Sequence, residues 1–222
     1  MYPCSFYKQY SPEVALENIY DILFAHFGPQ DWWPAESKLE TIIGAILTQS
    51  VNWTNVEKAI ANLKENNLLS IEALKEIDED RLAELIRPSG YYNMKAKKLK
   101  AFIEFLLEEY QGSMKYLFQE ELDTLRDKLL NVYGIGPETA DSILLYAGEY
   151  PTFVIDAYTK RILSRVGLSK VDIKYQQLKT LIMNNFSPDL KNYNEFHALL
   201  VKLAKENCKK SNPVCDNCIL SD

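Results

Sequence analysis

The sequence lacks a long apolar segment, a targeting pattern at its start and an excess of basic residues. No apolar run approaches the roughly 20 residues that a membrane-spanning helix needs, and Met1-Tyr2-Pro3-Cys4 has no charged-then-apolar signal pattern. We therefore expect a cytoplasmic protein with no membrane partner. The net charge of −6 argues against broad nonspecific nucleic-acid binding, although it leaves room for a local basic patch.

Strand-like alternation, internal repeats and low-complexity segments are also absent, and apolar residues recur instead at helical spacing. The 222 residues, 47% of them hydrophobic and 25% charged, suffice for one large or two small domains of ordinary composition. The sequence therefore predicts an all-α protein.

Capping residues mark where several helices begin. Ser11-Pro12-Glu13 combines an N-cap, a proline at the first position and an early acid, and predicts a helix to about His26. Ser37 opens an apolar helix, and Thr54-Asn55-Val56-Glu57 fits a capping box for the next one. Further helices are expected near residues 78–86, 95–110, 122–130, 140–147, 156–167, 172–185 and 193–207.

Cysteine is scarce but concentrated. The chain has four cysteines, and Cys208, Cys215 and Cys218 crowd into its last fifteen residues. In a reducing cytosol this crowding indicates ligation of a metal or cluster more than disulfide formation.

A glycine-punctuated turn, Tyr133-Gly134-Ile135-Gly136-Pro137, leads into a helix that has proline at its first position. Gly134 and Gly136 permit positive φ and close approach of another backbone. The helix start behind such a turn offers unpaired N–H groups and the positive end of the helix dipole, which together suit a phosphate. A plain helix–turn–helix corner with glycine as the C-cap is the alternative.

Aromatic and basic residues supply two further candidate sites. The adjacent Trp32 and Trp33 either pack into the core or form a stacking platform for a flat ligand. The lysines at the start of the expected helix at 95–110 are either a solvated face or contacts to phosphate, and they are Lys95, Lys97, Lys98 and Lys100.

Five segments together resemble one known family in order and separation. They are Ile43-Gly44-Ala45-Ile46-Leu47-Thr48-Gln49, the run from Ile86 to Ala96 around Gly90-Tyr91-Tyr92-Asn93, the hairpin Gly134-Ile135-Gly136, the segment Val154-Ile155-Asp156, and Cys208-x6-Cys215-x2-Cys218. Over nearly its whole length the chain resembles the helix-hairpin-helix DNA glycosylases of the endonuclease III superfamily. The resemblance implies a monomer that binds double-stranded DNA containing a damaged base. It also implies two lobes, a helical barrel at 36–150 and a second lobe that joins 1–35 to 151–222, with the start of the helix at Asp156 facing the hairpin.

The chemistry of base excision assigns roles to these residues. Breaking the bond between base and sugar builds positive charge on the sugar, which Asp156 can stabilise while it orients or deprotonates water; its alternative role is that of a helix N-cap. The target base must leave the stack, and Gln49 is our candidate for the side chain that replaces it. The amides of the hairpin, Gly134, Ile135 and Gly136, would hold a phosphate, and the resemblance implies an alkali metal ion on carbonyls nearby.

The residue after Pro137 decides the subtype. Bifunctional members of the family carry a lysine where this chain has Glu138, and a carboxylate cannot form an imine with the sugar. We therefore expect a monofunctional glycosylase whose substrate base already leaves easily, such as a cationic alkylated purine. Trp32 and Trp33 suit a cationic ring. The pair, with Glu138 and Asp156, resembles the 3-methyladenine DNA glycosylase branch.

The cysteine run departs from the family pattern. A [4Fe-4S] cluster usually takes four thiolates, and the family spacing would place the fourth cysteine beyond Asp222, where the given sequence stops. The expected outcomes are a shortened C-terminus, an incomplete or absent cluster, or a ligand from elsewhere. Cys4 is one candidate, and zinc on three cysteines plus His197 is a weaker alternative.

Three other functions stay open. A bifunctional glycosylase and lyase for oxidised pyrimidines would need another lysine near the sugar, such as Lys160. A noncatalytic DNA-damage-binding module would keep the hairpin but tolerate the loss of Asp156. An adenine-mismatch glycosylase is less favoured because no recognition domain follows the cysteines.

Overall fold

The computed structural model describes residues 3–30 and 32–221, and this part of the chain contains helices, turns and loops but no strand. The prediction of an all-α protein is therefore confirmed. No helix among these residues combines the length and the apolar character needed to cross a membrane. The chain divides into two compact units, which we name the contiguous unit (Trp33–Tyr150) and the terminal unit (Met1–Trp32 with Pro151–Asp222).

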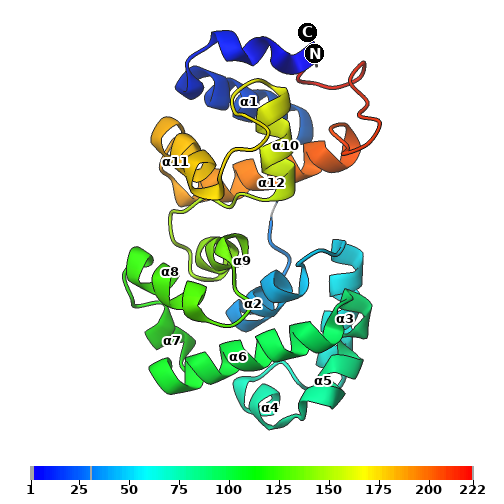
Figure 1. Ribbon diagram of the computed structural model, residues 1–222, viewed down its shortest axis with the longest axis vertical. Helices are drawn as coiled ribbons and strands as arrows, with labels where there is room; N and C mark the ends of the chain where they lie inside the picture. The colour runs from blue at the N-terminus through cyan, green and yellow to red at the C-terminus, as the bar shows by residue number, and fades with distance from the viewer. Residues whose placement is uncertain (1–2, 31, 222) are drawn as a thin grey trace. The chain divides into compact units, whose positions relative to one another are not determined.

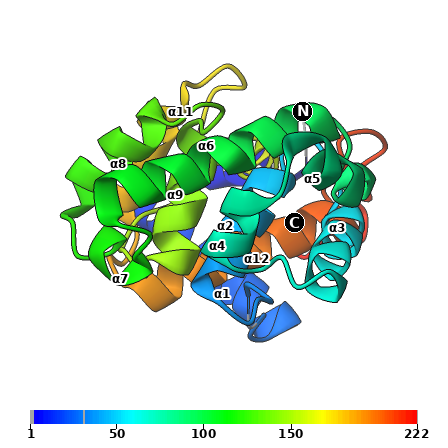
Figure 2. The ribbon, with the colours of Figure 1, turned by 90° about the horizontal axis from the view of Figure 1, so that it is seen from below.

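The contiguous unit contains eight α-helices among its described residues (Figure 1). They are α2 (Lys38–Leu47), α3 (Trp53–Glu65), α4 (Ile71–Glu76), α5 (Glu79–Leu85), α6 (Tyr92–Tyr110), α7 (Met114–Leu117), α8 (Leu122–Asn131) and α9 (Pro137–Ser142). A short 3-10 turn, η2 (Arg87–Ser89), precedes α6, and a π-helical turn, η3 (Ile143–Ala147), follows α9 directly. Figure 2 shows α6 extended along this unit, where it packs against α2, α4, α5 and α7.

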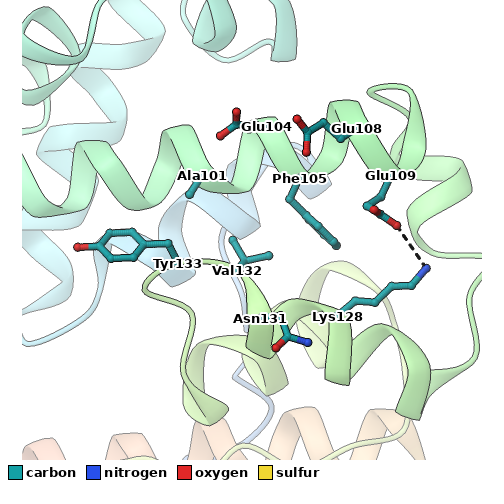
Figure 3. A pocket seen from close by; sticks show the side chains of 9 residues that line it. All are labelled: Ala101, Glu104, Phe105, Glu108, Glu109, Lys128, Asn131, Val132 and Tyr133. Carbon is teal, nitrogen blue, oxygen red and sulfur yellow. Dashed lines mark ion pairs between the residues drawn. The ribbon is translucent and has the colours of Figure 1, made fainter.

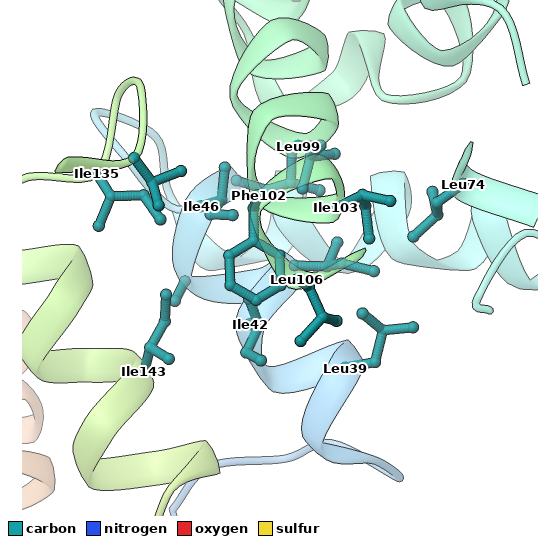
Figure 4. Close-up of a cluster of buried hydrophobic side chains, with 14 of the residues drawn as sticks. Leu39, Ile42, Ile46, Leu74, Leu99, Phe102, Ile103, Leu106, Ile135 and Ile143 are labelled. Carbon is teal, nitrogen blue, oxygen red and sulfur yellow. The ribbon is translucent and has the colours of Figure 1, made fainter. Parts of the chain in front are cut away.

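The core of the contiguous unit lies between α2, α6 and the helices around them (Figure 4). Helix α2 is buried at every position from Leu39 to Leu47, while α6 contributes one apolar face that includes Phe102 and Leu106. Fully burying a side chain of this size stabilises a fold by about 1.5–3 kcal/mol. Because α2 is surrounded by the core, the loop that leaves its end starts from a fixed position.

Helices α6 and α12 (Leu190–Glu206) begin three residues before their predicted starts, α11 (Tyr175–Asn185) begins three residues after its own, and α4 and α7 were not predicted. Two further differences have a local cause. Helix α3 begins at Trp53 because the side chain of Asn52 accepts a hydrogen bond from the Asn55 amide at 3.1 Å. The predicted cap at Thr54 is therefore wrong by two residues, since the polar side chain just upstream takes that position. The helix after the hairpin continues through Ala147 as predicted, but it widens into the π-helical turn η3, in which Gly148 donates to the Ile143 carbonyl.

The terminal unit combines residues from both ends of the sequence. It contains the 3-10 helix η1 (Pro3–Gln9) and the helices α1 (Pro12–Phe27), α10 (Ala157–Arg165), α11 (Tyr175–Asn185) and α12 (Leu190–Glu206). Helix α12 packs against α1 and α10, and α11 packs against α1. Aromatic rings fill this unit, with Phe153, Phe186, Tyr193 and Phe196 in mutual contact.

Candidate active site and DNA-binding elements

The hairpin between α8 and α9 has one glycine in the left-handed region. Gly134 has φ +78°, and a Cβ there would overlap the side chain of Lys98, so two reasons require glycine. Gly136 instead has φ −95° and caps α9 with extended backbone, so the expectation of positive φ is wrong at this position. Pro137 occupies the first position of α9, as predicted.

The backbone of the hairpin is partly available to a ligand. Within the described residues, neither the Gly134 amide nor the Gly136 amide donates a hydrogen bond. The Ile135 amide already donates to the Val132 carbonyl at 3.1 Å, and the Ile135 side chain lies in the core. Ile135 therefore offers no donor to a phosphate, which corrects its expected role, whereas the two glycine amides can point to an anion.

A buried ion pair fixes the two helices of the hairpin. Arg126 on α8 donates from Nε and Nη2 to the two carboxylate oxygens of Asp141 on α9, at 2.8 and 3.2 Å. Asp141 is fully buried and the side chain of Arg126 is 16% exposed. This two-point geometry holds α8 and α9 in one orientation.

Gln49 is tied to the hairpin. Its Nε2 donates to the Gly134 carbonyl at 3.1 Å and to the Thr139 hydroxyl at 2.9 Å, while its Oε1 accepts from Lys98 Nζ. The side chain expected to enter the duplex is therefore folded back in this structure. To act as a plug it must exchange these hydrogen bonds for contacts with DNA.

The lysines at the start of α6 have three different environments. Lys95 is buried, and its ammonium donates to the carbonyls of Leu47 and Ser89 at 2.7 and 2.6 Å. It joins the end of α2 to η2, so the expected contact of Lys95 with phosphate is wrong. Lys98 covers the hairpin, Lys97 is exposed and available to a phosphate, and Lys100 binds carbonyls at the end of α4.

Burial changes the basicity of Lys95. Desolvation, helped by the positive charge of Lys98, lowers the pKa of Lys95 from its ordinary 10.5 to about 8. The hydrogen bonds to two carbonyls act the other way, because they favour the ammonium form. Lys95 is thus a structural cation. Its carbonyl partners reduce the free-energy cost of burying the ammonium, but they do not remove it.

Asp156 caps α10 in the terminal unit. Its Oδ1 accepts from the Thr159 amide at 2.7 Å, and its Oδ2 lies 3.7 Å from Nε2 of the buried His197 on α12. The side chain of Asp156 is 13% exposed. Asp156 therefore fills the N-cap role that the sequence suggested, while one edge of its carboxylate stays accessible.

Opposing effects act on the Asp156 carboxyl. Burial raises its pKa, but the nearby His197 imidazole and the hydrogen bond from the Thr159 amide outweigh burial, so the pKa of Asp156 is below its ordinary value. The carboxylate is consequently an anion at neutral pH. An anion in a poorly hydrated position interacts strongly with a positive charge that develops nearby.

Each tryptophan of the expected platform packs against its own unit. The Lys205 ammonium lies 5.5 Å from the centre of the Trp32 ring. The Trp33 ring contacts Trp53 edge-to-face at 4.9 Å and Tyr146 at 5.0 Å. A Cβ on Gly44 would lie 3.2 Å from the Trp33 ring, so the missing side chain makes room for the indole on α2.

The four cysteines are the candidate ligands of a cofactor. None of them forms a disulfide, and Cys4 and Cys208 are buried. Among the described residues, no three or more His, Cys, Asp or Glu side chains are arranged to hold a single metal ion. A zinc site that includes His197 is therefore not supported. Thiols from both ends of the chain nevertheless meet at Arg165, whose carbonyl lies 3.7 Å from Cys4 Sγ and whose Nη1 lies 3.3 Å from Cys208 Sγ. Four cysteines are also the donor set that an iron–sulfur cluster takes.

A surface cavity of about 420 Å³ lies between α6 and α8 (Figure 3). Glu104, Glu108 and Glu109 line it, and Lys128 pairs with Glu109 at 3.9 Å. Because carboxylates repel phosphate, this face is unsuited to the DNA backbone. Tyr133 also lines the cavity, so the acidic face borders the hairpin.

Sequence reasoning missed two residues with functional geometry. His197 contacts Asp156 although it lies far along the chain, and no local motif marks it. Tyr91 precedes α6 with φ +47° and a 75% exposed side chain. An aromatic residue held in this unfavourable conformation is typical of a functional position, and the family-like segment around Gly90 and Tyr91 was its signal in the sequence.

Comparisons with known proteins agree with this arrangement. Residues 43–188 match the model of the HhH-GPD superfamily of base excision DNA repair proteins. A protein of Methanocaldococcus jannaschii, whose name assigns it provisionally to the DNA repair glycosylases, is 48% identical over 92% of this chain and 93% of its own length. Endonuclease III of Sulfolobus acidocaldarius is 31% identical over 82% of this chain and 79% of its own length.

Solved structures show the same fold. The H. pylori 3-methyladenine DNA glycosylase MagIII bound to 1,N6-ethenoadenine has a TM-score of 0.75 and 29% identity, over 89% of this chain and 98% of that one. A noncovalent endonuclease III–DNA complex has a TM-score of 0.81 at 20% identity, over 94% and 92% of the two chains. The chain is therefore a member of the HhH-GPD superfamily of base excision repair DNA glycosylases.

Proposed function

We propose that this protein is a monofunctional DNA glycosylase, which hydrolyses the bond between deoxyribose and a flipped damaged base, preferentially an alkylated purine. The observation that carries the proposal is the environment of Asp156. Its carboxylate caps α10, is kept anionic by His197 and Thr159, and keeps an accessible edge.

Asp156 supplies the chemistry in this proposal. As the base departs with the bonding electrons, positive charge grows on the sugar, and the preformed anion stabilises it without reorganisation. The same carboxylate then accepts a proton from the water that attacks the sugar. His197 keeps Asp156 ionised, and the α10 cap fixes the direction in which the carboxylate points.

The hairpin anchors the DNA in this proposal. The amides of Gly134 and Gly136 receive a backbone phosphate, and Lys97 adds an exposed charge. Backbone donors let a protein of net charge −6 hold DNA locally. Gln49 leaves the Gly134 carbonyl and fills the space of the flipped base; the released carbonyl is then available to the expected alkali metal ion.

Glu138 supports base release without strand cleavage. It is exposed near the start of α9, at the position where bifunctional relatives carry the imine-forming lysine. A carboxylate cannot supply the amine that an imine requires. Lys160 is the alternative amine, since it lies one helical turn after Asp156 on α10.

The aromatic residues support an alkylated purine as substrate. An indole face attracts a cationic ring by about 0.5–2 kcal/mol, and Trp32 already has the Lys205 ammonium near its ring. A cationic base would take the place of that ammonium. The likeness to the H. pylori 3-methyladenine glycosylase supports the same substrate class.

The test is chromatography of the bases released from alkylated, deaminated and oxidised duplex DNA. We expect 3-methyladenine from alkylated DNA, and none from the Asp156→Asn variant. Release of only a deaminated or oxidised base would overturn the substrate class while keeping the glycosylase. Release of no base from any of the three DNAs, by protein that still binds the duplex, would favour a noncatalytic binding module.

Borohydride trapping on abasic DNA tests the monofunctional subtype. We expect no covalent protein–DNA product from the wild type, because Glu138 replaces the amine. Efficient trapping that disappears in Lys160→Ala would instead identify a lyase with its nucleophile on α10. The Lys191→Ala variant is the matched control, since it removes an exposed lysine of the same unit that has no assigned role.

A further inference from the structure

Cys4 lies with the three cysteines of the C-terminal loop, although it comes from the other end of the chain. It is 8% exposed, inside η1. Within the loop, the Asn207 carbonyl accepts from the Val214 amide at 2.9 Å, and the Asn207 side chain donates to the Asn217 carbonyl at 3.1 Å. These two hydrogen bonds bring together the immediate neighbours of Cys208, Cys215 and Cys218.

Arg165, the last residue of α10, connects these thiols. The Cys4 thiol points to the Arg165 carbonyl at 3.7 Å, and Arg165 Nη1 lies 3.3 Å from Cys208 Sγ. The same guanidinium donates to the carbonyls of Lys209 and Lys210 at 2.7 and 3.2 Å. Arg165 therefore connects a thiol near the start of the chain with the loop that carries the other three cysteines.

The loop itself is shaped by hydrogen bonds around its cysteines. Ser221 donates from its hydroxyl to the Cys215 carbonyl at 2.7 Å and from its amide to the Cys218 carbonyl at 2.8 Å. The Cys218 amide donates to the Cys215 carbonyl at 3.0 Å. These contacts form a tight turn that holds Cys215 and Cys218 close to each other.

A zinc ion and an iron–sulfur cluster require different distances between their cysteine sulfurs. A single tetrahedral zinc ion with bonds of about 2.3 Å brings its sulfurs to within about 4 Å of one another. No group of three such ligands is present in the described part of the chain. A cubane cluster separates its thiolates more widely, because iron and sulfide lie between them.

We propose that Cys4 is the fourth ligand of a [4Fe-4S] cluster whose other ligands are Cys208, Cys215 and Cys218. Each thiol loses its proton when it binds iron, and the guanidinium of Arg165 offsets part of the resulting negative charge. The cluster would join η1 to the C-terminal loop. Its role is structural, since base hydrolysis transfers no electrons.

The experiment measures iron and acid-labile sulfide in the full chain purified without oxygen, together with the absorbance band near 400 nm. We expect about four irons per chain in the wild type. Cys4→Ala removes the ligand and should lower the iron content to three or fewer, with the spectrum of a three-iron cluster or none. Cys218→Ala is the reference for loss of a loop ligand, and Ala15→Ser is a control for a small change at a buried position of the same unit.

Cys4→Ser keeps the proposal testable if the alanine variant does not fold. Serine retains the size of cysteine and offers an oxygen to iron, so we expect a bound cluster with an altered spectrum and reduction potential. Wild-type iron content and spectrum in Cys4→Ala would overturn the proposal. So would a wild-type protein that binds zinc or no metal after anaerobic reconstitution with iron and sulfide. Since no activity is measured, this result is independent of the proposed glycosylase function.

Discussion

Asp156 and Asp141 are both largely buried aspartates in or beside a short helix, and each lies next to a basic side chain. Asp141, in the contiguous unit, is fully buried and binds Arg126 at two points. Asp156, in the terminal unit, has one oxygen 3.7 Å from His197 and remains 13% exposed. The difference is in the partner as well as the exposure, since arginine is always charged and histidine is not.

This comparison separates a structural carboxylate from a reactive one. A carboxylate whose oxygens both bind one guanidinium has little capacity left for a substrate. Asp156 caps a helix with one oxygen, and its other oxygen lies 3.7 Å from the His197 imidazole. Such a carboxylate can still interact with water and with the sugar. Substitution of Asp156 should therefore lower the rate of base release, whereas substitution of Asp141 should lower the stability of the fold.

The largest effect is expected for Asp156→Asn. Asparagine is as good an N-cap as aspartate, so the stability of the terminal unit should change little. Without the anion and the proton acceptor, the rate of base release should fall by about 10⁴-fold. Single-turnover excision and duplex binding are measured on the same preparation, and excision near the wild-type rate would remove Asp156 from the mechanism.

Asp141→Asn should give the opposite result. The substitution leaves the Arg126 guanidinium without its charged partner, which costs about 3–5 kcal/mol of the free energy of unfolding for a buried pair. Urea titration measures this loss, and excision per folded molecule should remain within a few-fold of wild type. A stable Asp141→Asn variant that had lost excision would show that the two aspartates do not divide as we infer.

Lys95 offers a second structural charge, with a pH signature. Its folded pKa of about 8 lies below its ordinary 10.5, so between these values the unfolded chain holds a proton that the folded chain has lost. Stability contributed by Lys95 therefore rises as pH rises from about 8 to 10.5, by at most about 3 kcal/mol. The carbonyl hydrogen bonds reduce this gain, because they favour the ammonium form.

Comparison with Lys95→Met isolates this effect. Urea titrations give the free energy of unfolding of both proteins at pH 7 and at pH 10. The change between the two pH values is then compared for wild type and variant, so that the contributions of the other titrating groups cancel. We expect the wild type to gain stability relative to the variant at the higher pH. An unchanged difference would mean that the Lys95 ammonium is not desolvated, and Lys97→Met, at an exposed position, provides the baseline.

Local chemistry explains which features could be predicted from the sequence. Ser11, Ser37 and Pro137 mark helix starts because a cap and its amide lie within a few residues of each other. Gly134 was identified for the same reason, since the conformation of a turn depends on its own residues. The prediction of the α3 cap was wrong because Asn52 and Thr54 are both suitable N-cap residues. They lie only two positions apart, and local preference does not decide between them.

Lys95 was misassigned although the signal was present. It lies four residues before Leu99 and therefore on the apolar face of α6, while Lys97 lies on the opposite face. The four lysines are close together in the sequence, but helical periodicity places them on different faces of α6. His197 and Cys4 are different, because the residues they contact, Asp156 and Arg165, lie far away along the chain, and only tertiary packing brings them together.

The smallest effect should be that of His197, and it tests the comparison most directly. Burial raises the pKa of Asp156, and His197 is the main influence that lowers it. Without the imidazole, the carboxyl should bind a proton at higher pH, so the acid limb of the excision profile should move to higher pH. At neutral pH the loss should be about tenfold, which corresponds to an electrostatic contribution of about 1.4 kcal/mol.

Two substitutions distinguish positioning from packing. His197→Phe fills the space without a donor, whereas His197→Gln keeps an amide donor, so the acid limb should move further in the phenylalanine variant. A purely structural role would lower the free energy of unfolding and leave the pH profile in place. If both variants keep the wild-type profile, His197 does not set the charge of Asp156, and the contrast with the permanently charged Arg126 loses its functional meaning.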